Sequence, residues 1–95
     1  MVIGVMELQL ALVDNGSLKE KRSVVKRVIH RSRNKFNISA AEVEDQDCTD
    51  RATIGVVAVG NDRRRIQSTL DKVEGFVERL ALAEILGAPK TVETF

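Results

Sequence analysis

Apolar residues along this chain switch between two spacings, and the order of the switches limits the folds that it can adopt. Residues 2–13 alternate, with Leu8 and Leu10 on one side of the chain and Glu7 and Gln9 on the other. A period of two residues predicts a strand with one face on a hydrophobic core. Three more segments, residues 37–45, residues 51–60 and a stretch between residues 82 and 95, also have strand character.

Two segments space their apolar residues by three and four, which is typical of amphipathic helices. The apolar stripe of the first contains Leu18, Val25, Val28, Ile29 and Phe36, and that of the second contains Ile66, Leu70, Val73, Phe76, Val77 and Leu80. Asp14-Asn15-Gly16 breaks the preceding strand, Ser17 with Glu20 forms a capping-box pattern, and Asn61-Asp62 offers the second cap.

Local features refine this outline at three places. The apolar phase changes within residues 37–45, which predicts a bulge or a bend in that strand. Gly75 lies inside the second helix, where it costs about 1 kcal/mol relative to Ala or marks a close contact. Pro89 confines the last strand to an edge of the sheet or ends it early.

The order β-α-β-β-α-β predicts a ferredoxin-like α+β sandwich, with both helices on one face of a four-stranded antiparallel sheet. The first and third strands are central, and residues 1–95 form a single domain, since chains this short seldom form two cores. The predicted core consists of Leu8, Leu10, Val25, Ile29, Ile54, Val56, Leu70, Val73 and Val77.

Charge is segregated along the chain although the net charge is only +1. Between Ser17 and Lys35 there are eight cations and one acid, Glu20, so pairing along the helix cannot neutralise this face. These cations either bind an external anion such as phosphate, or they form a solvated helix face that the acids of residues 42–50 balance. Arg63, Arg64 and Arg65 form a second cationic cluster in the first turn of the second helix, offset either by Asp62 or by a bound anion.

Composition argues against an enzyme or a metal protein. One His and one Cys, Cys48, make histidine-based triads and multi-histidine or cysteine-ligated metal sites improbable. No phosphate-binding glycine loop and no EF-hand is present. Glu42 and Glu44 fall on one face of a strand and could form a carboxylate pair, but a general acid also needs a pocket. We therefore expect no catalytic residues, no metal, no cofactor and no small-molecule substrate.

No targeting segment and no membrane span is visible, so we expect a cytoplasmic protein with no membrane partner. The lone Cys fits a reducing compartment.

Three segments resemble the YlxP-like family of small uncharacterised bacterial proteins: SLKEKRSVVKRVI, FNISAAEVEDQD and RATIGVVAVGND. Residues 17–23, Ala41-Glu42-Val43 with Gln46-Asp47, and Asn61-Asp62 match the family's pattern, and the chain after Leu80 follows it loosely. The resemblance implies a ferredoxin-like fold and a bacterial cytoplasmic protein. Genes of this family often lie near those for translation initiation and ribosome maturation factors, which implies a role there. The resemblance supplies no catalytic residues.

Two functional hypotheses follow. The first is a non-enzymatic module that docks on structured RNA, such as ribosomal RNA or ribosomal particles, through phosphate contacts. Its predicted contact residues are Lys19, Arg22, Lys26, Arg27, Arg31 and Arg33. The alternative is a homo-oligomeric or protein-binding module with no nucleic-acid role.

A predicted oligomer interface is compatible with either hypothesis. Ile3, Val5, Val57 and Val59 should lie together on the open side of the sheet. We expect a second subunit, as in a homodimer, or the chain's own tail to cover them, because exposed aliphatic patches are unusual in monomers.

Overall fold

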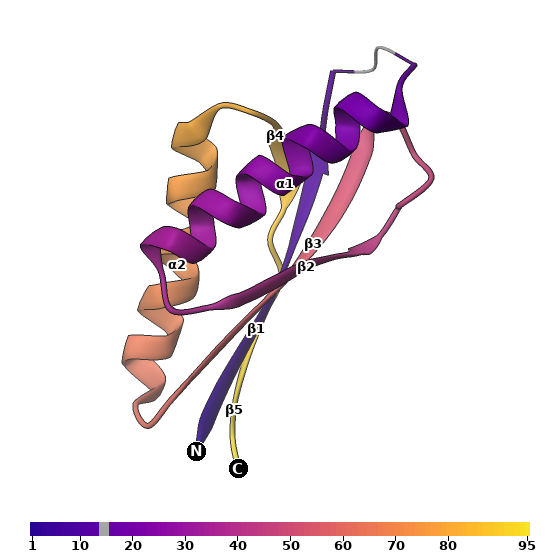
Figure 1. Ribbon diagram of the computed structural model, residues 1–95. Coiled ribbons are helices and arrows are strands. Elements are labelled where there is room, and N and C mark those ends of the chain that lie inside the picture. The colour runs from indigo at the N-terminus through magenta and orange to yellow at the C-terminus, as the bar shows by residue number, and fades with distance from the viewer. Residues whose placement is uncertain (14–15) are drawn as a thin grey trace.

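The computed structural model describes residues 1–13 and 16–95, so the predicted break at Asp14 and Asn15 lies outside the described residues (Figure 1). The elements are β1 (Val2–Ala11), α1 (Leu18–Lys35), β2 (Ser39–Glu44), β3 (Arg51–Gly60), α2 (Arg63–Leu80), β4 (Glu84–Gly87) and β5 (Lys90–Thr94). The order β-α-β-β-α-β is confirmed, with the last strand in two parts.

The sheet is antiparallel and has β1 and β3 at its centre, as predicted. Its strand order is β2-β3-β1-β4, and β5 also pairs with β1. The β1–β3 ladder runs without interruption from Val2 opposite Gly60 to Ala11 opposite Arg51. This arrangement is the α+β ferredoxin-like fold.

The fourth position of the sheet differs from the prediction, because two short strands fill it, which gives the sheet five strands within residues 1–13 and 16–95. Pro89 lies between β4 and β5 and has no N–H for a ladder bond, which ends the first of them. The Pro89 carbonyl still accepts a hydrogen bond from the Glu7 N–H at 3.1 Å, which carries the chain along β1 into β5. The expected edge position of this strand is confirmed, because β4 and β5 lie at the edge of the sheet and pair with β1, and Pro89 interrupts the strand between them.

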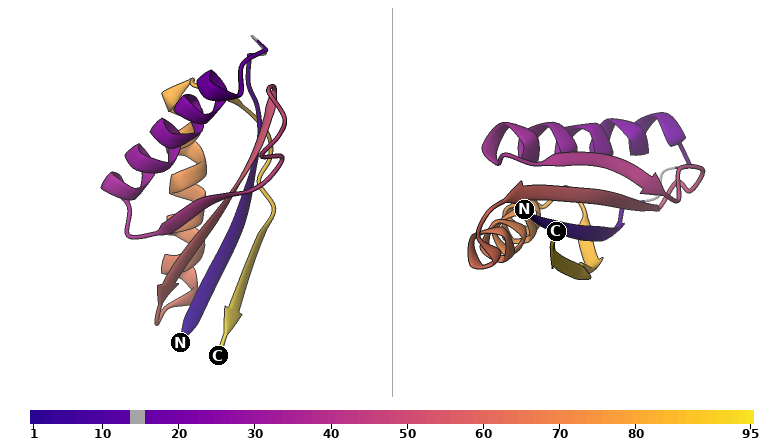
Figure 2. Two further views of the ribbon diagram at one scale, coloured as in Figure 1. Left: turned by 45° about the vertical axis from the view of Figure 1, so that its right-hand side comes forward. Right: turned by 90° about the horizontal axis from the view of Figure 1, so that it is seen from below.

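Both helices cover the same face of the sheet (Figure 2). The core between the layers is built from Val2, Met6, Leu8, Leu10, Val25, Val28, Ala52, Ile54, Val56, Ala58, Ile66, Leu70, Val73 and Val77. Eight of the nine predicted core residues are buried. Ile29 is the exception and is only half-buried, because it lies at the margin of the α1 stripe, one position beyond Val28.

The helices begin at the predicted caps. The Ser17 hydroxyl accepts a hydrogen bond from the Glu20 N–H at 3.2 Å. The Asp62 carboxylate accepts from the N–H groups of Arg64 at 2.9 Å and Arg65 at 3.2 Å. These contacts satisfy donors that have no partner within the helix.

Helix α2 packs closely on β1 because Gly4 has no side chain. A Cβ atom at Gly4 would lie 2.4 Å from Cγ2 of Ile66 and 3.0 Å from Cδ1 of Leu70. The glycine thus permits an approach that any larger residue would prevent without movement of α2.

The predicted irregularity of the second strand lies between Glu42 and Glu44, where the register with β3 shifts. Glu42 pairs with Ile54, which faces the helices, whereas Glu44 pairs with Thr53 of the opposite phase. The prediction that the two carboxylates share one face is therefore wrong. The bulge separates them, and a carboxylate pair for acid–base chemistry is not formed.

Candidate nucleic-acid interface

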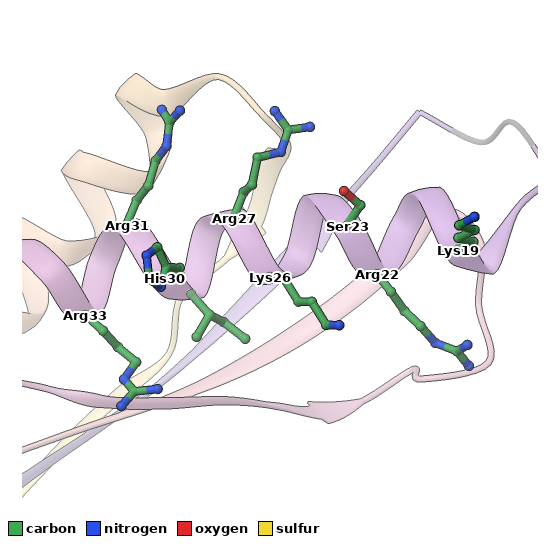
Figure 3. A pocket seen from close by; sticks show the side chains of 9 residues that line it. Lys19, Arg22, Ser23, Lys26, Arg27, His30, Arg31 and Arg33 are labelled. Atoms are coloured by element: carbon green, nitrogen blue, oxygen red, sulfur yellow. The ribbon is translucent and has the colours of Figure 1, made fainter.

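The six predicted contact residues form one continuous exposed surface on α1. We call this surface the basic face and define it as Lys19, Arg22, Lys26, Arg27, Arg31 and Arg33, all of which are exposed. Their side chains diverge from the helix (Figure 3): Arg27 and Arg31 extend to one side, and Arg22, Lys26 and Arg33 extend to the other. The helix therefore presents cations along both flanks.

The basic face is long and electrostatically unfavourable in isolation. It extends over four turns, about 21 Å at the helical rise of 1.5 Å per residue. Arg22 with Lys26, and Arg27 with Arg31, are like charges four residues apart, and each such pair destabilises a helix by about 0.2–0.5 kcal/mol.

None of these cations is neutralised by a carboxylate within residues 1–13 and 16–95. The ion pairs there involve Lys21, with Glu42, and Lys90, with Asp71 and Glu74. The solvated-face alternative, in which the acids of residues 42–50 balance the helix, finds support at Lys21 alone. The six cations of the basic face remain available to an external anion.

Lys21 differs from its neighbours because it lies on the core side of α1. Its side chain is 1% exposed, and Nζ donates to Oε2 of Glu42 at 2.5 Å and to the carbonyl of Asp45 at 2.8 Å. The residue ties α1 to β2 and to the start of the following loop. The sequence did contain a signal for this position, because Lys21 lies four residues before Val25 and seven before Val28.

The surface between the cations is a shallow trough with a mixed floor. Ser23, Ile29 and His30 line it together with the basic face (Figure 3). Because all its lining residues belong to one helix, the trough is open to solvent and cannot enclose a small substrate. A large, negatively charged partner can contact such an open surface along its length.

The first turn of α2 uses its cations differently. Arg63 donates from Nη2 to the Val92 carbonyl at 2.9 Å and from Nη1 to the Thr94 hydroxyl at 3.0 Å, which fastens β5 to the helix. The Asp62 cap lies beside Arg64 and Arg65, which agrees with local compensation at this helix end. The anion alternative is not needed to explain Arg63.

The acidic residues of the β2–β3 connection are mostly exposed and do not converge. Asp45 adopts φ 62° and accepts a hydrogen bond from the Thr53 hydroxyl at 3.1 Å. Cys48 is a free, half-buried thiol in the same loop. Within the described residues, no group of three or more His, Cys, Asp or Glu side chains is arranged to hold a metal ion.

Lys90 forms the second ion-pair site, between β5 and α2. Its Nζ lies 2.5 Å from Oε1 of Glu74 and 3.5 Å from Oδ1 of Asp71. The hydrogen bond to Glu74 is the main cause that raises the pKa of Lys90 above its ordinary value. The site is structural, since it joins the last strand to the helix that precedes it.

The open face of the sheet, on the side away from the helices, carries the predicted apolar group. Ile3 lies opposite Val59 and Val5 opposite Val57, as predicted. Ile3 is half-buried, whereas Val5, Val57 and Val59 are 42%, 40% and 56% exposed. The tail does not cover them, because it continues the sheet sideways as β5; that part of the prediction is wrong.

Neither helix in the described part of the chain is long and apolar enough to cross a membrane.

Solved structures first place the chain in a structural class. It superposes on a de novo designed protein with ferredoxin fold, LFR1 1, with a TM-score of 0.58 and 21% identity over all of this chain and 88% of the designed one. The structural-genomics protein YJCS gives a TM-score of 0.52 at 12% identity over 94% of this chain and 96% of that one. These similarities support the fold alone.

Sequence comparison then gives the family. The model described as "Protein of unknown function (DUF503)" matches residues 3–89. Over 77 residues, 81% of this chain and 84% of the relative, the sequence is 40% identical to the "Uncharacterized protein YlxP" of Bacillus subtilis (strain 168). The chain therefore belongs to the DUF503 family, and its resemblance to YlxP-like proteins is confirmed.

Proposed function

We propose that the protein is a non-enzymatic binding module that docks on structured RNA through the basic face of α1. The observation that carries the proposal is the row of six exposed cations with no carboxylate partner among the described residues. Ribosomal RNA is the class of structured RNA on which we would test it first, and the proposed compartment is the cytoplasm.

The composition of the basic face supports a phosphate partner. Four of its six cations are Arg, whose planar guanidinium matches two phosphate oxygens at once. The chain contains no Tyr or Trp, and its three Phe residues lie outside the basic face, so this surface cannot stack on bases. We therefore expect electrostatic attraction to phosphates to provide most of the binding free energy, with little preference for RNA sequence.

The test is RNA binding over a salt series, with ribosomal subunits and a structured RNA fragment as ligands. With about four phosphate contacts, the slope of log K against log salt concentration should be roughly −3 to −4. Changing Lys26, Arg27 and Arg33 together to Glu should abolish binding and leave the fold intact, since exposed substitutions change stability by only about 0.5 kcal/mol each.

A matched variant separates the effect of the basic face on RNA binding from the effect of the protein's net charge. Arg64, Arg65 and Lys72 are exposed cations of α2, and changing all three to Glu alters the net charge by the same amount. This control should bind RNA with a similar slope. If the folded α1 variant binds as tightly as the wild type, or if both variants lose binding equally, the basic face is not the RNA-binding surface.

A further inference from the structure

We infer that the open face of the sheet is an interface between two copies of this chain, which form a face-to-face dimer with α1 on both outer surfaces. The inference concerns a different surface from the basic face and does not depend on RNA binding. It rests on where the exposed hydrophobic side chains lie.

Exposed large hydrophobic residues gather on one surface of the described structure. Five of them belong to the open face, and the others are Val13 and the terminal residues Met1 and Phe95. The five are Val5 in β1, Val43 in β2, Val57 and Val59 in β3, and Leu86 in β4. Several exposed aliphatic side chains on one face are unusual on a monomer and mark association surfaces.

Neighbouring residues make this face smooth enough to stack. Gly55 has no side chain, and Val43 leans over it, so that a Cβ there would lie 3.0 Å from Val43 Cγ1. The space above Gly87 is similarly occupied by Gln9, whose Oε1 would be 2.7 Å from an added Cβ. At Val43, Gly55 and Val57 the short side chains give this part of the face a low relief, against which a second sheet can pack about 10 Å away.

The dimensions fit a second copy of the sheet. Strands β1 and β3 have 10 residues each, and four strand positions about 4.8 Å apart with about 3.3 Å per residue give a face of roughly 600 Å². Two such faces bury about 1,200 Å², which is the lower limit of stable, specific interfaces.

Charge also favours the open face over α1 for self-association. The basic face carries a single sign, so two copies of it repel each other. The open face carries both signs, with Glu7 in β1, Glu93 opposite Ile3 and Arg51 opposite Ala11, so a copy of the face can supply opposite charges. A two-fold pairing of one face with itself closes as a dimer, whereas docking of basic helix on acidic loop would propagate head to tail.

Sedimentation velocity on nuclease-treated protein, over about a 100-fold concentration range, tests the inference. The wild type should be a dimer. Val57→Lys buries a charge within the interface and should weaken the dimer about 100-fold, a typical effect at an interface centre. Val13→Lys makes the same change at a side chain that is 90% exposed and off the open face, and it should leave the dimer intact.

Val59→Lys is the second variant, at a position already 56% exposed, and it decides the question should Val57→Lys fail to fold. A wild type that remains monomeric at the highest concentration overturns the inference. So does a dimer that persists in both folded variants. The charge-reversed α1 variant should remain dimeric, so RNA binding and dimerisation can fail independently.

Discussion

The two helices have the same length and cover the same sheet, yet they use their charged residues in opposite ways. The buried stripe of α2 is wholly apolar, with Ile66, Leu70, Val73 and Val77. The buried residues of α1 are Lys21, Val25, Val28 and Ser32, so half of that stripe is polar. Helix α2 therefore packs with apolar side chains alone, whereas α1 also buries polar groups and exposes six cations that have no carboxylate partner among the described residues.

The contact between the helices shows the same division. Phe36, at the end of α1, meets Phe76 of α2 edge to face with 5.6 Å between ring centroids. Nζ of Lys35 lies 5.3 Å from the centroid of Phe76. Lys35 thus directs its charge toward the Phe76 ring of α2, and the other exposed cations of α1 form the basic face.

The largest expected effect on stability comes from core substitutions, which compare how much the packing of each helix contributes to the free energy of unfolding. Leu70→Ala and Ile29→Ala delete the same number of carbon atoms, but Leu70 is fully buried and Ile29 is half-buried. Leu70→Ala should lower the free energy of unfolding by about 2–5 kcal/mol, and Ile29→Ala by about 1 kcal/mol. Denaturant unfolding measures both. Equal losses would mean that α1 packs as tightly as α2.

A second prediction concerns the polar half of the α1 stripe. Lys21→Ala removes the partner of Glu42 and leaves that carboxylate partly buried, which should cost about 2–3 kcal/mol of stability. Lys19→Ala, the same change at an exposed neighbour, should stay within about 0.5 kcal/mol. Similar stabilities for the two variants in denaturant unfolding would show that the buried ion pair makes no net contribution.

A third prediction concerns two glycines, Gly75 within α2 and Gly4 of β1, against which α2 packs. A Cβ at Gly75 would meet only Nη1 of Arg79, at 3.2 Å, and that group is the end of a flexible side chain. Gly75→Ala should therefore raise stability by about 1 kcal/mol through helix propensity. Gly4→Ala should lower it, because Ile66 and Leu70 occupy the space. A thermal melt that shows Gly75→Ala to be destabilised would reveal a close contact at Gly75.

The smallest effect is a pH dependence at the Lys90 ion pair. Since the folded protein raises the pKa of Lys90, the stabilisation is fully present below the ordinary value of 10.5 and declines as pH rises through the folded pKa. Wild type should exceed Glu74→Gln by less than about 1 kcal/mol at pH 8, and the difference should shrink above pH 10.5. Unfolding curves at both pH values test this, and a difference that grows with pH would contradict it.

Sequence periodicity predicted the element order and the central strands because buried and more exposed residues alternate along the whole of β1 and along residues 54–59 of β3. Three details needed three-dimensional information. Whether Pro89 ends a strand or splits it depends on its partner Glu7, and the place of the β2 bulge depends on β3. The role of Lys21 depends on Glu42, which is distant in the sequence. The helical spacing of Lys21 from Val25 and Val28 nevertheless indicated that Lys21 lies on the core side of α1.

The candidate surfaces were predictable for a different reason. The basic face is local, since one helix contains all of its residues and helical geometry alone exposes them. The apolar group of the open face followed from the antiparallel register, in which Ile3 and Val5 meet Val59 and Val57. What covers that group could not be predicted, because residues 90–94 extend the sheet instead of folding over it.

The burial of Lys21 divides the lysines at the start of α1 into two chemical classes. Acylating reagents and acetyltransferases need an accessible, neutral amine, and Nζ of Lys21 is enclosed and engaged with Glu42. Lys19 and Lys26 are exposed and can be acylated. Acylation of the native protein can therefore reduce the charge of the basic face by two units at most, while the four arginines and the tether to β2 remain intact.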